Sequence, residues 1–211
     1  MPIDTNSHKE HDIYYVSAEI EDIKWENEEK TIDQVQFNPD QPLGSMMRLH
    51  KATLNVAVDV GSGHGWTSEL LSKDFAKVYA IEPSEHASSL CKQLYPQIDS
   101  IEWICGFAED ELGKLELKEP ALFVTSCVFS HLNDDAVVDI CKAIDLLAPE
   151  GSAITMSENW SLYGKDFAQK LWYSRTQKWW KARFPGWELD FKTEPTKDQL
   201  GSFKGITGLK I

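Results

Sequence analysis

Short apolar runs alternate with segments of helical periodicity through the middle of the chain. Five runs rich in β-branched residues span 56–60, 77–81, 101–106, 121–127 and 152–158. Such near-continuous runs are typical of strands that are buried on both faces of a parallel sheet. Helices are predicted between them over 67–75, 84–94 and 135–147, and two final strands over 187–194 and 203–211. This alternation predicts an α/β fold with a doubly wound sheet.

The segment before the two final strands is rich in aromatic and basic residues. Asp166 to Phe184 is predicted to form one helix, which Pro185 and Gly186 end. From Lys165 to Arg183 the chain has six basic residues and one acidic residue. Two interpretations stay open. Either the helix faces an anionic or sugar-like substrate, or its tryptophans pack on the sheet while its lysines are solvated.

The first apolar run leads into three glycines at alternate positions. Val56–Val60 is followed by Gly61, Gly63 and Gly65, just before the first predicted helix. Glycine permits positive φ and lets a ligand approach bare backbone, while a helix N-terminus supplies free N–H groups. In open parallel sheets, ligands bind at the carboxyl ends of the strands. The segment therefore predicts a site for a nucleotide-like ligand.

The spacing of these glycines distinguishes between kinds of nucleotide loop. The dinucleotide fingerprint G-x-G-x-x-G needs a third glycine where this chain has Trp66, and no G-K-[ST] ending of a P-loop follows. Asp59-x-Gly61-x-Gly63-x-Gly65 instead resembles motif I of the class I S-adenosylmethionine-dependent methyltransferases. The resemblance implies S-adenosylmethionine as the cofactor. It places around that cofactor Asp59, Gly61, Ser62, Gly63 and Gly65.

An acidic residue, Glu82, ends the second predicted strand, 17 residues after Gly65. A carboxylate at this place can accept hydrogen bonds from both hydroxyls of a ribose. The resemblance gives Glu82 this role, with Pro83 beside it in the cofactor site. The alternative is that Glu82 only caps the helix that begins near Ser84.

The segment after the third strand departs from the family. Family members commonly have an acidic or amide side chain there, which binds the adenine amino group. This chain has Phe107 at that place, followed by Ala108, Glu109 and Asp110. We expect Glu109 or Asp110 to take the hydrogen bond, and Phe107 or Ala108 to form an apolar wall. At the end of the fourth strand, Cys127 completes the predicted cofactor site.

Two later motifs, Val128-Phe129-x-His131-Leu132 and Leu147-x-Pro149-x-Gly151, also resemble the family, so the resemblance covers about residues 50–160. It implies a Rossmann-like, seven-stranded, mostly parallel sheet in the order 3-2-1-4-5-7-6, with an antiparallel C-terminal hairpin. Residues 51–211 are then the methyltransferase domain. Residues 1–50 are expected to be an N-terminal arm that is partly disordered over 1–12 and forms a lid over 13–50. The alternative for this arm is a partly disordered tail with one docking element.

Methyl transfer needs an acceptor held close to the methyl carbon, and it needs a base only where the acceptor arrives protonated. His131 is the predicted catalytic base, because the exit of the fourth strand lies beside the methyl group in this architecture. The alternative is that His131 only caps the next helix or hydrogen-bonds a loop. Glu158 and Tyr163, past the fifth strand, are predicted to bind the acceptor. His64 is expected to shape the glycine loop.

Charge narrows the choice of acceptor. The chain has 21 basic and 34 acidic residues, a net charge of −13, and residues 1–50 hold 11 acids against 4 bases. Phosphate contacts need clustered Lys and Arg, and no Asn-Pro-Pro-Tyr-type motif of amino-base methylation follows the fourth strand. We therefore expect no nucleic acid partner and a hydroxyl or amine of a small molecule or glycan as acceptor. The competing functions are a non-catalytic cofactor-binding module and a dehydrogenase.

Composition also indicates the cellular setting. The four cysteines, Cys91, Cys105, Cys127 and Cys141, form no C-x-x-C pair, so we expect neither a disulfide nor a metal site. They suit a reducing, cytoplasmic location. No apolar run approaches the length of a membrane span and the start of the chain has no signal-peptide pattern, so we expect no membrane association. The aromatic residues leave a homodimer interface open.

Overall fold

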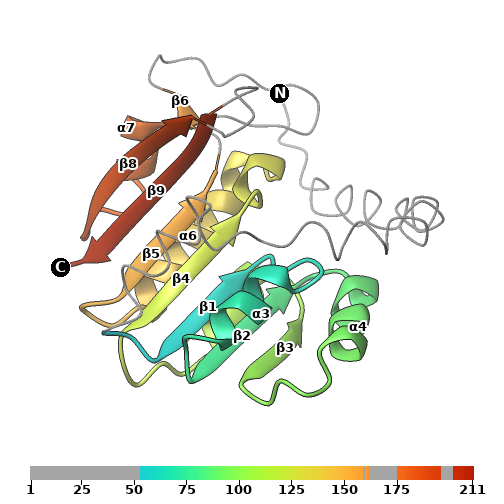
Figure 1. The fold of residues 1–211 in the computed structure, drawn as a ribbon. Coiled ribbons are helices and arrows are strands. Elements are labelled where there is room, and N and C mark those ends of the chain that lie inside the picture. The colour runs from blue at the N-terminus through green and yellow to red at the C-terminus, as the bar shows by residue number, and fades with distance from the viewer. Residues whose placement is uncertain (1–52, 159, 162–174, 196–201) are drawn as a thin grey trace.

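The computed structural model describes residues 53–158, 160–161, 175–195 and 202–211 (Figure 1). The predicted arm over residues 1–50, the predicted acceptor-binding residue Tyr163 and the first part of the basic aromatic segment lie outside the described residues. Their roles therefore stay predictions.

One seven-stranded sheet organises the described chain (Figure 1). Its strands are β1 (Val56–Val60), β2 (Lys77–Glu82), β3 (Ile101–Cys105), β4 (Ala121–Ser126), β5 (Ala153–Ser157), β8 (Trp187–Pro195) and β9 (Ser202–Lys210). They lie in the order β3-β2-β1-β4-β5-β9-β8. Strands β1 to β5 are parallel, and β9 is antiparallel to both β5 and β8. Numbered by their own succession, these strands follow 3-2-1-4-5-7-6, so the predicted order and the antiparallel hairpin are confirmed.

Helices cover both faces of this sheet (Figure 1). They are α3 (Trp66–Ser72), α4 (Glu85–Leu94), α5 (Ala108–Glu111), α6 (Asp134–Leu147) and α7 (Gln177–Lys181), with the 3₁₀ turns η1 (Leu112–Lys114) and η2 (Phe129–His131). The helices predicted over 67–75, 84–94 and 135–147 are confirmed within a few residues as α3, α4 and α6. The doubly wound α/β class is therefore confirmed.

The sheet separates two apolar clusters. Leu71 of α3 joins one cluster with Ala57, while Ile140 of α6 and Trp180 of α7 join the other with Val58. Ala57 and Val58 are adjacent in β1 and fully buried, because successive strand side chains point to opposite faces. Burial of such side chains stabilises the fold by about 1.5–3 kcal/mol for each large one. β1 is thus fixed from both sides, which makes its carboxyl end a rigid place for a site.

Side-chain caps fix the beginning of two helices beside that end. The Oγ of Ser84 accepts the N–H of Ala87 at 3.2 Å and starts α4. The Oδ1 of Asn133 accepts the N–H of Ala136 at 2.9 Å and starts α6. Each such cap contributes about 1 kcal/mol. The caps therefore hold the turns that follow β2 and β4.

The single helix predicted from Asp166 to Phe184 is wrong in its described part. Arg175 and Thr176 form a short strand, β7 (Arg175–Thr176), which pairs in parallel with β6 (Trp160–Ser161). The Oγ1 of Thr176 then accepts the N–H of Trp179 at 3.1 Å, which caps the short α7. Trp180 is fully buried in the core, as the packing interpretation of this segment expects. Pairing with another strand and a side-chain cap override the local helical periodicity here.

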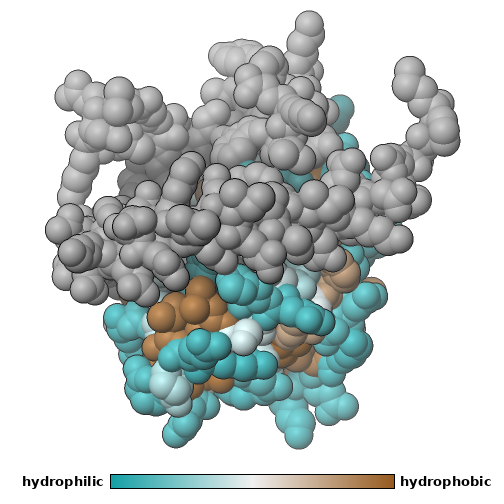
Figure 2. Space-filling model, turned by 90° about the vertical axis from the view of Figure 1, so that its right-hand side faces the viewer, coloured by the Kyte–Doolittle hydropathy of each residue, from teal (hydrophilic) through white to brown (hydrophobic). Residues whose placement is uncertain are grey.

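The described surface is mainly polar. The large hydrophobic side chains exposed on it are Leu94, Leu146, Leu209 and Ile211. Figure 2 shows hydrophobic areas interrupted by hydrophilic residues on the described part of the face that it draws. Within the described ranges, no helix combines the length and apolar character that a membrane span requires.

Candidate functional site

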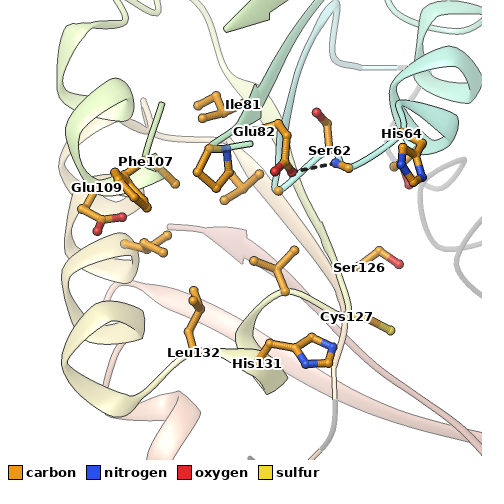
Figure 3. Close-up of a pocket in the computed structure, with 18 of the residues that line it drawn as sticks. Ser62, His64, Ile81, Glu82, Phe107, Glu109, Ser126, Cys127, His131 and Leu132 are labelled. Atoms are coloured by element: carbon orange, nitrogen blue, oxygen red, sulfur yellow. Dashed lines mark hydrogen bonds between the residues drawn. The ribbon is translucent and has the colours of Figure 1, made fainter. Parts of the chain in front are cut away.

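A cavity of about 360 Å³ lies at the carboxyl edge of the sheet (Figure 3). Its lining comes from the glycine loop after β1 with the start of α3, the end of β2, the turn into α5, the exit of β4, and Ile140 of α6. The segments at the ends of strands are neighbours, because β2, β1 and β4 are adjacent in the sheet. The carboxyl edge of the sheet, where the sequence predicted a ligand site, therefore contains a cavity.

The three glycines of the loop differ in what surrounds them. Gly61, Gly63 and Gly65 have φ values of 73°, 51° and 82°, a region that residues with a Cβ rarely adopt. A Cβ on Gly61 would lie 2.4 Å from Val128 Cγ2, and one on Gly65 would lie 2.6 Å from the ring of Trp103. Among the described residues, no atom lies within 4 Å of a Cβ built on Gly63. The lack of a Cβ at Gly61 and Gly65 thus lets the side chains of Val128 and Trp103 pack closely against the loop. Gly63 leaves open space beside the backbone.

Glu82 lies at the end of β2 and lines the cavity (Figure 3). Its Oε2 accepts the backbone N–H of Gly63 at 2.9 Å, and its Oε1 accepts that of Ser84 at 2.9 Å. The residue is 3% exposed. A carboxylate oxygen is a hydrogen-bond acceptor only, so these bonds orient the carboxylate between the glycine loop and α4. The contact with Ser84 supports helix α4, so the capping alternative describes part of what this side chain does.

Asp59 lies behind the cavity and does not line it. Its Oδ2 accepts the hydroxyl of Ser68 at 2.6 Å, and the residue is 1% exposed. Burial and, to a smaller extent, the nearby charge of Glu82 raise the pKa of this carboxyl to about 7, although the hydrogen bond from Ser68 opposes the shift. Asp59 therefore joins β1 to α3 beneath the glycine loop, and its place in the cofactor site stays a prediction.

The turn after β3 supplies the apolar end of the cavity. Phe107, Ala108 and Glu109 line it, and Pro83 lines it from the end of β2. Phe107 is the N-cap residue of α5. Figure 3 shows Phe107 and Glu109 at the end of the cavity opposite His64 and Cys127. Asp110, the other predicted partner of adenine, is not among the lining residues.

The exit of β4 forms the opposite wall, where Ser126, Cys127, His131 and Leu132 line the cavity. Cys127 has a φ of 58°, and its N–H donates to the carbonyl of Ser157 at 2.9 Å. Its pKa is raised, chiefly by burial. The imidazole of His131 is carried by η2 and lies on the same side of the cavity as Cys127 (Figure 3). His64, from the glycine loop, lines this end too.

Glu158 does not lie in this wall, although the sequence predicted that it binds the acceptor. The residue is 3% exposed and does not line the cavity. Its Oε1 accepts the hydroxyl of Thr125 at 2.9 Å and the N–H of Val128 at 3.0 Å, while Oε2 accepts the N–H of Ser130 at 3.0 Å. Burial raises its pKa, and the hydrogen bonds oppose that shift. Its oxygens thus face the backbone of the β4 exit, and the acceptor-binding role of Glu158 stays a prediction.

Two residues that the sequence analysis did not single out support the glycine loop. The thiol of Cys91, in α4, donates to the carbonyl of Gly63 at 3.2 Å. Burial is the main reason that its pKa rises to about 12, so the thiol stays protonated and remains a donor. The ring of Trp103 packs where Gly65 has no Cβ. Cys91 and Trp103 are typical core residues in the sequence, so no local signal points to this role.

Comparisons with known proteins agree with this geometry. A family model described as a methyltransferase domain matches residues 58–155. Among curated proteins, none matches this chain in sequence.

Solved structures share the fold at low sequence identity. One is the 1,6-didemethyltoxoflavin-N1-methyltransferase of Burkholderia thailandensis, with a TM-score of 0.69, 16% identity, and coverage of 100% of this chain and 92% of that chain. Another is an rRNA methylase from Streptococcus thermophilus, with a TM-score of 0.58, 14% identity, and coverage of 82% and 98%. TehB from Haemophilus influenzae aligns with a TM-score of 0.61 and 15% identity over 80% of this chain, which spans only 62% of TehB.

The matched residues 58–155 run from β1 to β5 and include the glycine loop, Glu82 and the exit of β4. Residues 58–155 thus match a methyltransferase domain, as the resemblance in the sequence predicted, and the described chain has the fold of the class I S-adenosylmethionine-dependent methyltransferases.

Proposed function

We propose that the protein transfers the methyl group of S-adenosylmethionine to a hydroxyl or amine of a small molecule or glycan. The observation that carries the proposal is the placement of Glu82. Its buried carboxylate lines the cavity at the end of β2 and is held by the N–H of Gly63, beside the open space at that glycine. This combination offers an oriented acceptor for ribose hydroxyls next to backbone that a ligand can approach.

The cavity fits an adenosyl ligand in two further respects. The Oγ of Ser62 is buried and has no hydrogen-bond partner among the described residues, so it is available to a polar group of a ligand. Pro83, Phe107 and Ala108 supply apolar surface at the other end, which suits an adenine ring. Glu109 lines the same end and is the candidate partner of the adenine amino group.

The chemistry follows from the position of these groups. When bound, S-adenosylmethionine supplies an electrophilic methyl carbon on a sulfonium. The exit of β4 and the glycine loop confine the space where an acceptor meets that carbon, and such positioning lowers the barrier. His131 lines this space and carries an imidazole that can take the proton from a hydroxyl or ammonium acceptor. Its role as base is part of the proposal.

The proposed class of acceptor rests on the net charge of the chain and on the residues that line the cavity. Of the described residues, no Lys or Arg lines the cavity, and the whole chain carries a net charge of −13. An acceptor with many phosphates would meet little compensating charge. The Burkholderia relative is by its printed name a methyltransferase of 1,6-didemethyltoxoflavin, while another relative is an rRNA methylase. We favour the small molecule or glycan and treat RNA as the alternative to be tested.

Radiolabelled methyl transfer tests this choice. The protein is incubated with methyl-labelled S-adenosylmethionine and, separately, with a small-molecule extract, a glycan fraction and total RNA. We expect label in a small-molecule or glycan product and none in RNA above a sample without enzyme. Label in RNA alone contradicts the proposed acceptor class.

A second candidate is a cofactor-binding module without catalysis. Phe107 favours it, because the family commonly has a polar partner for adenine at that place. Binding of S-adenosylmethionine without turnover on any of the fractions supports the module. Turnover with any acceptor excludes it. The dehydrogenase has less support, since Trp66 stands where its fingerprint needs glycine.

A further inference from the structure

We propose that Arg175 is a positioning residue for methyl transfer. It acts together with Glu158 to hold the exit segment, residues 127–133, which carries His131. The inference rests on the proposed function, because it concerns the placement of the proposed base. Neither side chain lines the cavity. Both act through the backbone of the exit segment.

Glu158 holds the exit segment by its N–H groups. One oxygen accepts the N–H of Val128 at 3.0 Å, and the other accepts that of Ser130 at 3.0 Å. The hydroxyl of Thr125, in β4, donates to the same carboxylate at 2.9 Å. The first residues of the segment are thus tied to a buried anion that follows β5.

Arg175 holds the same segment by its carbonyl groups. Its Nη1 donates to the carbonyl of Phe129 at 2.5 Å, and its Nη2 donates to that of Leu132 at 2.7 Å. Its Nε donates to Oδ1 of Asp134, the first residue of α6, at 2.8 Å. The side chain is 2% exposed, so these bonds lie away from bulk solvent. A planar guanidinium presents its donors in a fixed fork, which lysine does not reproduce.

Glu158 and Arg175 therefore bind backbone groups before and after His131. Glu158 is bonded to Val128 and Ser130, and Arg175 is bonded to the carbonyls of Phe129, where the turn η2 begins, and Leu132, just after its end. The strand that contains Arg175 pairs with β6, which begins two residues after Glu158. The anion and the cation are thus anchored in adjacent backbone, and a shift of either moves the exit segment.

The exit segment also meets the cofactor loop. Val128 Cγ2 lies 2.4 Å from where a Cβ of Gly61 would be, so valine fills the space that this glycine leaves. A displacement of the segment therefore changes the packing of Val128 against Gly61. We expect the pair to set both the place of His131 and the packing of the exit segment on the glycine loop.

Hydrogen exchange and NMR of the full chain test the inference. The variants are Arg175→Met, Arg175→Lys and Glu158→Gln. The matched controls are Lys142→Met and Asp139→Asn, which break an exposed ion pair on α6. Each variant is also titrated with S-adenosylhomocysteine by calorimetry.

We expect the amides of Val128, Ser130 and His131 to exchange at least tenfold faster in Arg175→Met and Glu158→Gln than in the controls. The amides of β1 should keep their wild-type rates. The imidazole signals of His131 should shift in the same two variants, and Arg175→Lys should fall between wild type and Arg175→Met. Affinity for S-adenosylhomocysteine should change less than threefold, since Ser62, Glu82 and Glu109, among its proposed ligands, lie outside the exit segment.

The outcomes separate the two claims. Absence of S-adenosylhomocysteine binding to the wild-type protein overturns the proposed function. Binding to the wild type, with exit-segment exchange and His131 signals of the variants equal to those of the controls, overturns only the positioning role. If Arg175→Met does not fold, Asp134→Asn and Arg175→Lys decide by the same criteria, because each removes part of the contacts of Arg175.

Discussion

Glu82 and Gly63 are joined by a hydrogen bond of 2.9 Å from the backbone N–H to Oε2, although 19 positions separate them in the chain. This bond connects the end of β2 to the glycine loop after β1. The other oxygen of the carboxylate accepts the N–H of Ser84, where α4 begins. A single buried carboxylate therefore orders two segments that line the cavity, and ribose binding and helix support at Glu82 are compatible.

Replacing Glu82 by alanine should weaken S-adenosylhomocysteine binding by about 1.5–3 kcal/mol, the usual range for hydrogen bonds to a charged group. The dissociation constant should then rise about 10- to 150-fold in calorimetry. Glu102→Ala is the matched control, because Glu102 is an exposed acid at the sheet edge paired with Lys77. Unchanged affinity in a folded Glu82→Ala protein would falsify the ribose assignment.

Replacing His131 by alanine should leave S-adenosylhomocysteine affinity within about threefold, since the ribose and adenine contacts are elsewhere. Turnover with the acceptor should fall by about 10²- to 10⁴-fold, the typical contribution of a general base. His86→Ala, on the exposed face of α4, should keep wild-type turnover. Equal turnover in His131→Ala returns this residue to the capping or loop-bonding role.

Replacing Gly63 by alanine should lower the affinity for S-adenosylhomocysteine while the protein still folds. The positive φ makes the substitution cost about 1–2 kcal/mol, but no atom of the described residues clashes with the new methyl group. The methyl group instead projects into the space proposed for the ligand, so affinity for S-adenosylhomocysteine should fall at least tenfold. Gly113→Ala, where there is also open space but no positive φ, is the control. Affinity equal to that of the control in Gly63→Ala means that no ligand approaches this glycine.

Asp59 should make the free energy of unfolding depend on pH. Its pKa is raised from 3.8 to about 7 in the fold, so between these pH values the folded chain holds a proton that the unfolded chain has lost. Stability therefore falls as pH rises through this window and levels off above it. The contribution lost is about 4 kcal/mol at most.

The Asp59→Asn variant isolates this effect, because asparagine keeps an acceptor for Ser68 and does not titrate. Urea unfolding at pH 5, 6, 7 and 8 should show the wild type losing stability relative to Asp59→Asn up to about pH 7, and no further. A constant difference across these pH values shows that Asp59 has the same pKa in both states.

The fold was predictable because its strands are short apolar runs that are separated by turn residues and helical segments. Residues such as Ala57 and Val58 are both buried, one on each face of the sheet, so the run is apolar at every position. Gly61, Gly63 and Gly65 mark the turn that follows. These signals are local, and they place the loop and Glu82 at the same edge of the sheet once the strands are parallel.

The support of the site was not predictable from local patterns. The helical periodicity around Arg175 gives no sign that its side chain reaches two carbonyls of the β4 exit, which lie more than 40 positions earlier. The acid at Glu158 was visible in the sequence, but only the fold shows that its oxygens face backbone N–H groups. Cys91 likewise lies 28 positions from Gly63, the carbonyl of which it contacts. Each of these is a contact between distant segments, which periodicity does not encode.

The most direct test of the account is a calorimetric titration of the purified protein with S-adenosylmethionine and S-adenosylhomocysteine, with NAD and NADP in parallel. The account predicts micromolar binding of both adenosyl ligands and no binding of the nicotinamide cofactors. Binding of NAD or NADP alone, or of none of the four ligands, contradicts it.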